Sequence, residues 1–195
     1  MQERFQEYFK SSQRLIDKII NDSLIYKRLV SAIAAIERCL MGGGKVVVAG
    51  NGGSAADAQH FAAELVGRFL HNRQALSAIA LTTDTSNITA IGNDFGFEHI
   101  FSRQVEALAR PGDIFFGIST SGNSQNIVNA VTACMKRGIT TIGLLGGYGG
   151  VLKDMVDIPL IVPHEKTPKI QEMHIAMIHF ICWELERSLS KEYKQ

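Results

Sequence analysis

The chain lacks an excess of charge of either sign, because 20 Lys and Arg residues stand against 19 Asp and Glu residues among 195. Proteins that attract nucleic acid or anionic membranes at long range carry a basic surplus, so the balance supports neither partner. No apolar run approaches the ~20 residues that span a bilayer. The first residues, MQERFQEYFK, lack the basic start and apolar run of a signal peptide. We therefore expect a cytoplasmic protein with no nucleic-acid and no membrane partner.

Cysteine is also scarce, and the three cysteines, Cys39, Cys134 and Cys182, are too widely spaced to form a metal-binding pair. Each lies in an apolar helical pattern, so we expect buried free thiols in a reducing compartment. Internal repeats and low-complexity segments are absent. The length of 195 residues and the 46% hydrophobic content predict one globular domain with a sizeable core.

Short apolar runs alternate with amphipathic helical patterns through the middle of the chain. Strands are predicted at 45–49, 78–81, 113–118, 140–145 and 157–162. Helices are predicted at 54–69, 84–91, 97–108 and 123–136. This alternation predicts an α/β fold, with a five-stranded parallel sheet covered by helices on both faces.

Helical segments flank this core on both sides. Residues 1–42 predict two helices broken at Asn21-Asp22-Ser23, and the first has an apolar stripe that includes Phe5 and Phe9. Residues 164–195 predict a helix from about Pro168 that is apolar over most of its circumference. Such a helix must be buried, which favours an oligomer interface; alternatively, these helices only cap the sheet. The domain would then comprise a helical extension (1–42), an α/β core (43–163) and a final helix (164–195).

Two loops at strand ends carry the residue types that bind phosphate. The strand at 45–49 runs into Gly50-Asn51-Gly52-Gly53-Ser54, and Ser54 is suited to cap the following helix. Bare backbone amides and the helix dipole make such a turn an anion site. The strand at 113–118 runs into a second loop rich in hydroxyl groups, Ser119-Thr120-Ser121-Gly122-Asn123-Ser124. Because parallel strands end at one edge, the two loops favour a site for a phosphate monoester.

The glycine loop also fits the dinucleotide fingerprint, but the nearest acidic ribose ligand, Asp84, comes 34 positions after Gly50 rather than about 20. A third polar turn, Gly92 to Gly96, contains Asn93 and Asp94, which in turns usually serve the backbone. By spacing alone we interpret these two residues as structural.

Polar residues within two helical segments are candidates for acid/base or metal chemistry. His60 and Glu64 are four residues apart and share a helix face; they could be an exposed pair, a core pair, metal ligands or acid/base groups. Gln171 and His179 interrupt the apolar final helix. Eight residues separate these two by ~12 Å along the axis and about 80° around it. We therefore expect that they serve one kind of site only from different subunits.

Together these motifs resemble the SIS (sugar isomerase) domain family, and closely its phosphoheptose isomerases. The matching segments are GNGGSAADAQHFAAEL at 50–65, IGNDFGFEHIFSRQVEAL at 91–108, GISTSGNS at 117–124 and KIQEMHIAMIH at 169–179. The resemblance covers essentially the whole chain. It implies conversion of sedoheptulose 7-phosphate into D-glycero-D-manno-heptose 7-phosphate, the first step towards bacterial surface heptose, including that of lipopolysaccharide.

The resemblance also implies roles for individual residues. Substrate phosphate would be held by Ser119, Thr120, Ser121 and Ser124, and Asn51, Gly52, Gly53, Ser54, Asn93, Asp94, Glu64 and Gln171 would face the substrate. This implication replaces the structural interpretation of Asn93 and Asp94. Similar enzymes are homotetramers with active sites between subunits and bind one zinc per subunit, through residues matching His60, Glu64, Gln171 and His179.

Glu64 and His179 match the acid/base pair of the family. Aldose–ketose interconversion moves a proton between C1 and C2 through an ene-diol(ate), with Glu64 as base and His179 as acid. A metal-bound carboxylate or imidazole is a poor proton carrier, so zinc either acts as a Lewis acid on the sugar oxygens or has a mainly structural role. Lys169 stands where relatives often carry Arg, and Pro168 where some carry an acid.

Three rival functions follow from the same motifs. A bacterial SIS relative binds the replication initiator protein without catalysis, but the presence of Glu64, Gln171 and His179 favours an enzyme. An isomerase of another ketose phosphate would share both loops. A dinucleotide oxidoreductase would have to bind NAD(P), which a titration would test.

Overall fold

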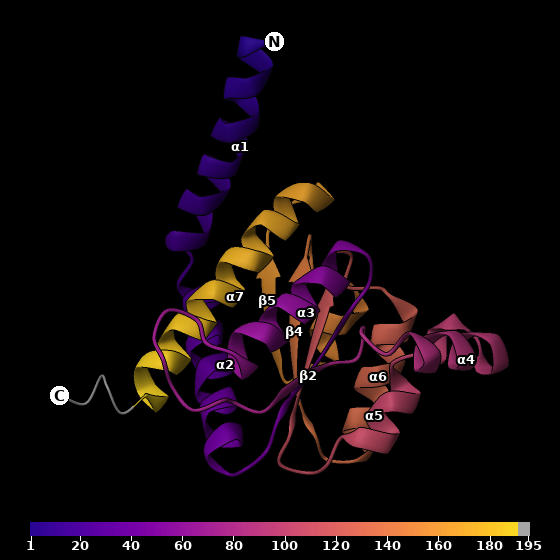
Figure 1. The fold of residues 1–195 in the computed structure, drawn as a ribbon. Coiled ribbons are helices and arrows are strands. Elements are labelled where there is room, and N and C mark those ends of the chain that lie inside the picture. Colours follow the sequence, from indigo (N-terminus) through magenta and orange to yellow (C-terminus); the bar gives the residue numbers. More distant parts are fainter. Residues whose placement is uncertain (191–195) are drawn as a thin grey trace.

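A computed structural model describes residues 1–190 and contains one sheet of five parallel strands (Figure 1). The strands are β1 (Val46–Gly50), β2 (Ala78–Ala80), β3 (Ile114–Ser119), β4 (Thr140–Gly146) and β5 (Ile158–Val162). Their spatial order is β2-β1-β3-β4-β5. The predicted α/β fold is confirmed, and each strand end lies within one residue of its predicted position.

Helices cover both faces of the sheet because alternate strand residues point to opposite sides. Val46 and Val48 of β1 pack in a core with α2 (Ser23–Met41), α3 (Gly53–Val66) and α7 (Thr167–Leu189). Val47 and Ala49 pack in a second core with α5 (Ser102–Leu108) and α6 (Gln125–Lys136). The parallel sheet is thus buried on both faces, as its continuous apolar strands require.

The predicted break between the first two helices is confirmed. The Asp22 carboxylate accepts hydrogen bonds from the backbone amides of Leu24 and Ile25, at 2.8 and 3.1 Å, and so caps α2. The same helix ends at Met41, before Gly43 turns the chain with φ +80°. A side-chain cap therefore sets the start of α2, and the glycine backbone sets its end.

Other local predictions were wrong. Gly52, not Ser54, precedes α3, and Ser54 is buried within the first turn. The polar turn at 92–96 belongs instead to α4 (Thr85–Phe95), which Asp84 caps and which ends where Gly96 has φ +94°. The single helix expected at 97–108 is split into a 3-10 turn (Phe97–His99) and α5. A second 3-10 turn spans Val151–Asp154.

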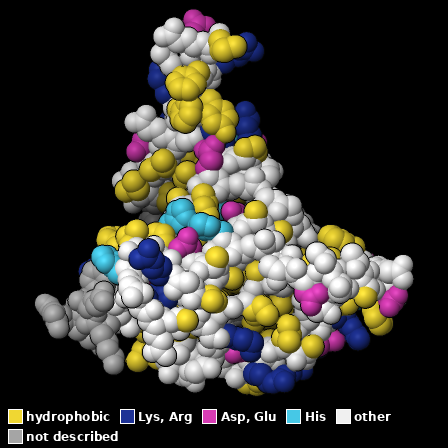
Figure 2. Space-filling model, viewed as in Figure 1, with side chains coloured by type: hydrophobic (Ala, Val, Ile, Leu, Met, Phe, Trp, Pro, Cys, Tyr) yellow, Lys and Arg dark blue, Asp and Glu magenta, His cyan; other side chains and the backbone are white. Residues whose placement is uncertain are grey.

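Helix α1 (Gln2–Ile20) extends away from the body of the molecule (Figure 1). Its apolar stripe is largely uncovered: Phe5 is 62% exposed, Phe9 57% and Ile20 72%. Apolar side chains run along the projecting part of the surface (Figure 2). By contrast, one face of α7 is buried and includes Met177 and Ile178, while Trp183 of the same helix is 39% exposed.

The three cysteines are buried and free, as expected. Burial raises the pKa of the Cys134 and Cys182 thiols to about 12. Among residues 1–190, no helix combines the length and the apolar character needed to cross a membrane.

Candidate active site

The site lies in the crevice where the strand order reverses. Strands β2 and β3 flank β1, so the loops after β1 and β3 leave the sheet side by side at its carboxyl edge. The amides of Asn51 and Asn126 join these loops by two reciprocal hydrogen bonds of 2.9 and 2.8 Å. As predicted, the glycine loop and the hydroxyl-rich loop share one edge of the sheet.

The hydroxyl-rich loop is closed around Ser119. Ser119 Oγ lies 3.0 Å from Ser124 Oγ and 3.5 Å from Ser121 Oγ. It also accepts a hydrogen bond from the Gly122 backbone amide at 3.1 Å. Gly122 turns the chain with φ +66°. Three hydroxyl groups thus converge within the span of one phosphate group, while Thr120 stands between them in the sequence.

In the glycine loop, the backbone is open at Gly52 and covered at Gly53. Gly52 has φ +55°, and a Cβ atom there would meet nothing within 4 Å. A Cβ atom on Gly53 would lie 2.3 Å from Gln171 Nε2, so the Gln171 amide packs directly on this loop. Ser54 is only 4% exposed, and its backbone amide donates to the Asn51 carbonyl at 2.9 Å.

A second group of polar side chains gathers where α3 and α7 meet. His60 Nε2 lies 2.9 Å from His179 Nε2 and 3.4 Å from Glu64 Oε1, and the Phe69 ring lies beside His179, with centroids 5.7 Å apart. Figure 2 shows His side chains next to an acidic side chain in this region. The structure therefore brings His60, Glu64 and His179 together.

Gln171 does not join this group within one chain. It lies at Gly53, at the start of α3, whereas His179 lies at His60, two turns further along that helix. Asn93 and Asp94 lie at the end of α4, where Asn93 Nδ2 donates to Asp94 Oδ1 at 2.8 Å. In the described part of the chain, no hydrogen bond joins these two residues to either loop.

The side chains at α3 and α7 suit a divalent metal in type. Imidazole nitrogens and a carboxylate are ligands that zinc accepts. Two nitrogens on one zinc would be about 3.3 Å apart, slightly more than the observed 2.9 Å. Within residues 1–190, no three His, Cys, Asp or Glu side chains already form a closed metal site. The residues thus fit the donor chemistry of zinc, and a further ligand would complete a four-coordinate site.

Two polar residues at the site were not predicted from the sequence. Asn126 is 2% exposed and holds Asn51 in place, but an amide in the first turn of a helix carries no special signal. Asp57 shares a face of α3 with His60, and its Oδ2 atom is buried without a hydrogen-bond partner. Burial raises the pKa of Asp57, against the opposing effect of His60.

Comparisons with known proteins place these features in a family. A family model described as the SIS domain matches residues 7–146. A phosphoheptose isomerase from Geotalea daltonii is 50% identical over 192 residues, which cover 98% of this chain and 99% of the relative.

Solved structures agree with this match. A phosphoheptose isomerase from Neisseria gonorrhoeae superposes with a TM-score of 0.89 at 47% identity, over 95% of this chain and 98% of that one. One from Francisella tularensis gives a TM-score of 0.91 at 40% identity, over 95% and 97% of the two chains.

Proposed function

The chain belongs to the SIS domain family, among its phosphoheptose isomerases, and we propose that it converts sedoheptulose 7-phosphate into D-glycero-D-manno-heptose 7-phosphate. The observation that carries this proposal is the similarity of about 50% identity over nearly the full length of both chains. The convergence of His60, Glu64 and His179 supports it, because a module that only binds a partner needs no such group. The reaction would take place in the cytoplasm and supply surface heptose.

The two loops would hold the substrate phosphate. The hydroxyls of Ser119, Ser121 and Ser124 converge, and the Gly52 backbone is open to a ligand. Hydroxyl and amide donors surrounding a phosphate bind it without a cationic side chain. Thr120, Ser54, Asn93 and Asp94 are assigned to the substrate by the family resemblance.

Glu64 and His179 would carry the protons, through the oxygen and nitrogen atoms that a bound metal leaves free. The Glu64 carboxylate removes a proton from C1 of the ketose, while His179 donates a proton to the C2 oxygen, giving the ene-diol. Return of a proton to C2 and loss of the proton on O1 then give the aldose. His60 lies between these two residues and would hold them at a fixed separation.

Zinc would be held by His60, Glu64 and His179, with Gln171 as a further ligand. Bound there, it would polarise the sugar oxygens as a Lewis acid or maintain the shape of the site. The observation that supports its presence is the pair of imidazole nitrogens directed at each other beside a carboxylate.

The site would be completed in a homotetramer. Gly53 and Glu64 are eleven residues apart on α3, so their Cα atoms are about 16 Å apart along the helix axis. Seven single bonds between C2 of the heptulose and its phosphorus span only about 9 Å. A phosphate bound at the Gly53 loop therefore cannot easily bring C2 to Glu64 of the same chain, which favours a site shared between subunits.

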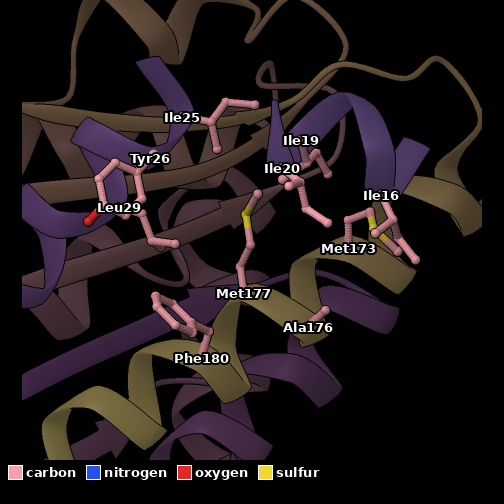
Figure 3. Close-up of a pocket in the computed structure, with 10 residues that line it drawn as sticks. All are labelled: Ile16, Ile19, Ile20, Ile25, Tyr26, Leu29, Met173, Ala176, Met177 and Phe180. Atoms are coloured by element: carbon pink, nitrogen blue, oxygen red, sulfur yellow. The ribbon is translucent and has the colours of Figure 1, made fainter. Parts of the chain in front are cut away.

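Uncovered apolar surface supports such an assembly. A cavity of about 360 Å³ separates the α1–α2 corner from α7, and apolar side chains such as Ile20, Leu29 and Phe180 line it (Figure 3). With the exposed stripe of α1, it gives a continuous apolar surface that a second copy can cover.

Two experiments test the proposal. The first measures turnover of sedoheptulose 7-phosphate beside fructose 6-phosphate and other ketose phosphates; rapid turnover of the heptulose alone is expected, and preference for another sugar would contradict the assignment. The second mixes Gln171→Ala and His179→Ala chains, each of which has reduced activity on its own. If sites are shared, activity returns in the mixed oligomer, whereas a persistently inactive mixture would place each whole site in one subunit.

A further inference from the structure

A buried ion pair lies beside the group formed by His60, Glu64 and His179, near the C-terminal ends of α3 and α7. After α3 ends at Val66, the chain turns back through residues 67–77 before entering β2. Arg73 of this loop faces Glu186 of α7, with Arg73 Nε 3.3 Å from Glu186 Oε1. The side chains of Arg73 and Glu186 are 3% and 0% exposed.

Glu186 holds the loop to α7. Its carboxylate accepts hydrogen bonds from three backbone amides, that of Phe69 at 3.1 Å and those of Leu70 and His71 at 2.9 Å each. Burial alone would raise the pKa of Glu186, but the three amides and Arg73 outweigh it and lower this pKa below its ordinary value. The carboxylate is therefore ionised at neutral pH, and its charge is fully engaged.

Arg73 holds the same loop to the end of α3. Its Nη2 donates to the Glu64 carbonyl at 2.7 Å, and its Nη1 donates to the carbonyls of Leu65 at 2.9 Å and Gln74 at 3.0 Å. The last carbonyls of a helix have no partner within the helix, so the guanidinium supplies one. One of these carbonyls belongs to Glu64 itself.

The pair thus connects the two helices that carry the acid/base residues. Glu186 follows His179 by seven residues, about two turns, and lies on the same face of α7. Two contacts bridge α3 and α7. Arg73 bonds the Glu64 backbone and faces Glu186 of α7, and His60 of α3 contacts His179 of α7. A change in the contact between Arg73 and Glu186 would move the Glu64 carboxylate relative to His179.

The geometry points to Arg73 and Glu186 as positioning residues that set the separation of Glu64 from His179. A buried ion pair seldom adds stability over well-packed apolar residues, so the geometry it imposes explains its presence better than stability does. The inference rests on the proposed function, because it takes Glu64 and His179 as the acid/base pair. Displacement of a reacting group by about 1 Å can slow catalysis by about 100-fold.

The test replaces Arg73 by lysine and Glu186 by glutamine in the full-length oligomer. Lysine retains the charge but cannot donate to three carbonyls with the planar fork of arginine. Glutamine retains an acceptor but not the charge. We expect both variants to assemble like wild type and to lose at least tenfold in kcat. KM should stay within twofold, because the phosphate loops lie at the other end of α3.

Asp113→Asn provides the matched control. Asp113 is also buried, at 5% exposed, and accepts hydrogen bonds from Lys45 and Arg110, but these partners lie on neither α3 nor α7. This variant should lose stability without losing kcat.

Three results would overturn the inference: wild-type kcat in either assembled variant, an equal loss of kcat in Asp113→Asn at the same loss of stability, or failure of both variants to assemble, which would assign the pair to folding. Inactivity of the wild-type enzyme would contradict the proposed function instead.

Discussion

Replacing Gly53 by alanine separates the stability of α3 from the position of Gln171. Gly53 is the first residue of α3, and its φ does not lie in the left-handed region, so alanine can adopt the same backbone. The added Cβ would lie 2.3 Å from Gln171 Nε2, whereas ordinary contacts begin at 3.4 Å. The Gln171 amide must therefore move by about 1 Å or more, while the backbone can remain in place.

The expected effects on stability and activity have different signs. Alanine is favoured over glycine in a helix by up to about 1 kcal/mol, so Tm should stay the same or rise. Loss of a well-placed hydrogen bond costs about 1–3 kcal/mol, which corresponds to a drop of roughly 5- to 150-fold in kcat/KM. Gln171→Ala should cause a similar drop, because both changes remove the same amide from the site.

Turnover and thermal unfolding of both single variants and the double variant form the assay. Since Gly53→Ala acts through Gln171, it should cost nothing further in the Gln171→Ala background. Gly92→Ala is the control, because a Cβ there meets only Ile100, at 3.7 Å, and its activity should stay unchanged. Additive losses in the double variant, or full activity of Gly53→Ala, would refute the placement of Gln171 on the loop.

Three further predictions follow from burial and charge. Burial lowers the pKa of His174 from 6.5 to about 4, so stability is complete above pH 6.5 and falls by about 3 kcal/mol as pH drops to 4. Urea unfolding should show a flatter pH dependence in His174→Gln, and an unchanged slope would contradict this. Returning zinc to the chelated protein should raise Tm in wild type but not in His179→Ala, whereas an equal rise in both would place zinc elsewhere. Ile20→Glu puts a charge on a side chain that is 72% exposed in one chain; it should dissociate the oligomer in sedimentation experiments, and an intact tetramer would exclude this surface from the interface.

The strands could be predicted from the sequence because both faces of a parallel sheet are apolar. Runs such as Val46 to Val48 have no other stable environment in a small domain. Helix ends were less predictable, since a helix N-terminus can be occupied by glycine as at Gly52, and Ser54 was consequently misassigned as a cap. The break after Phe95 depends on the positive φ of Gly96, which the pattern alone placed too early.

The partners within the site could be predicted only in part. The edge shared by Asn51 and Ser119 follows from sheet topology, which the alternating pattern implies. The contact of Gln171 with Gly53, by contrast, depends on how α7 packs on α3. The same packing pairs Arg73 with Glu186, residues far apart in the sequence whose local contexts give no sign of each other.

The most direct test of the proposed chemistry follows sedoheptulose 7-phosphate by proton NMR in D2O, with wild type and Glu64→Gln compared at equal oligomer content. We expect wild type to form the aldose with deuterium from solvent at C2, because the proton passes through a carboxylate that can exchange. Glu64→Gln should form neither product nor deuterated ketose. Conversion by the variant at the wild-type rate, or product that never acquires deuterium, would contradict proton transfer by Glu64.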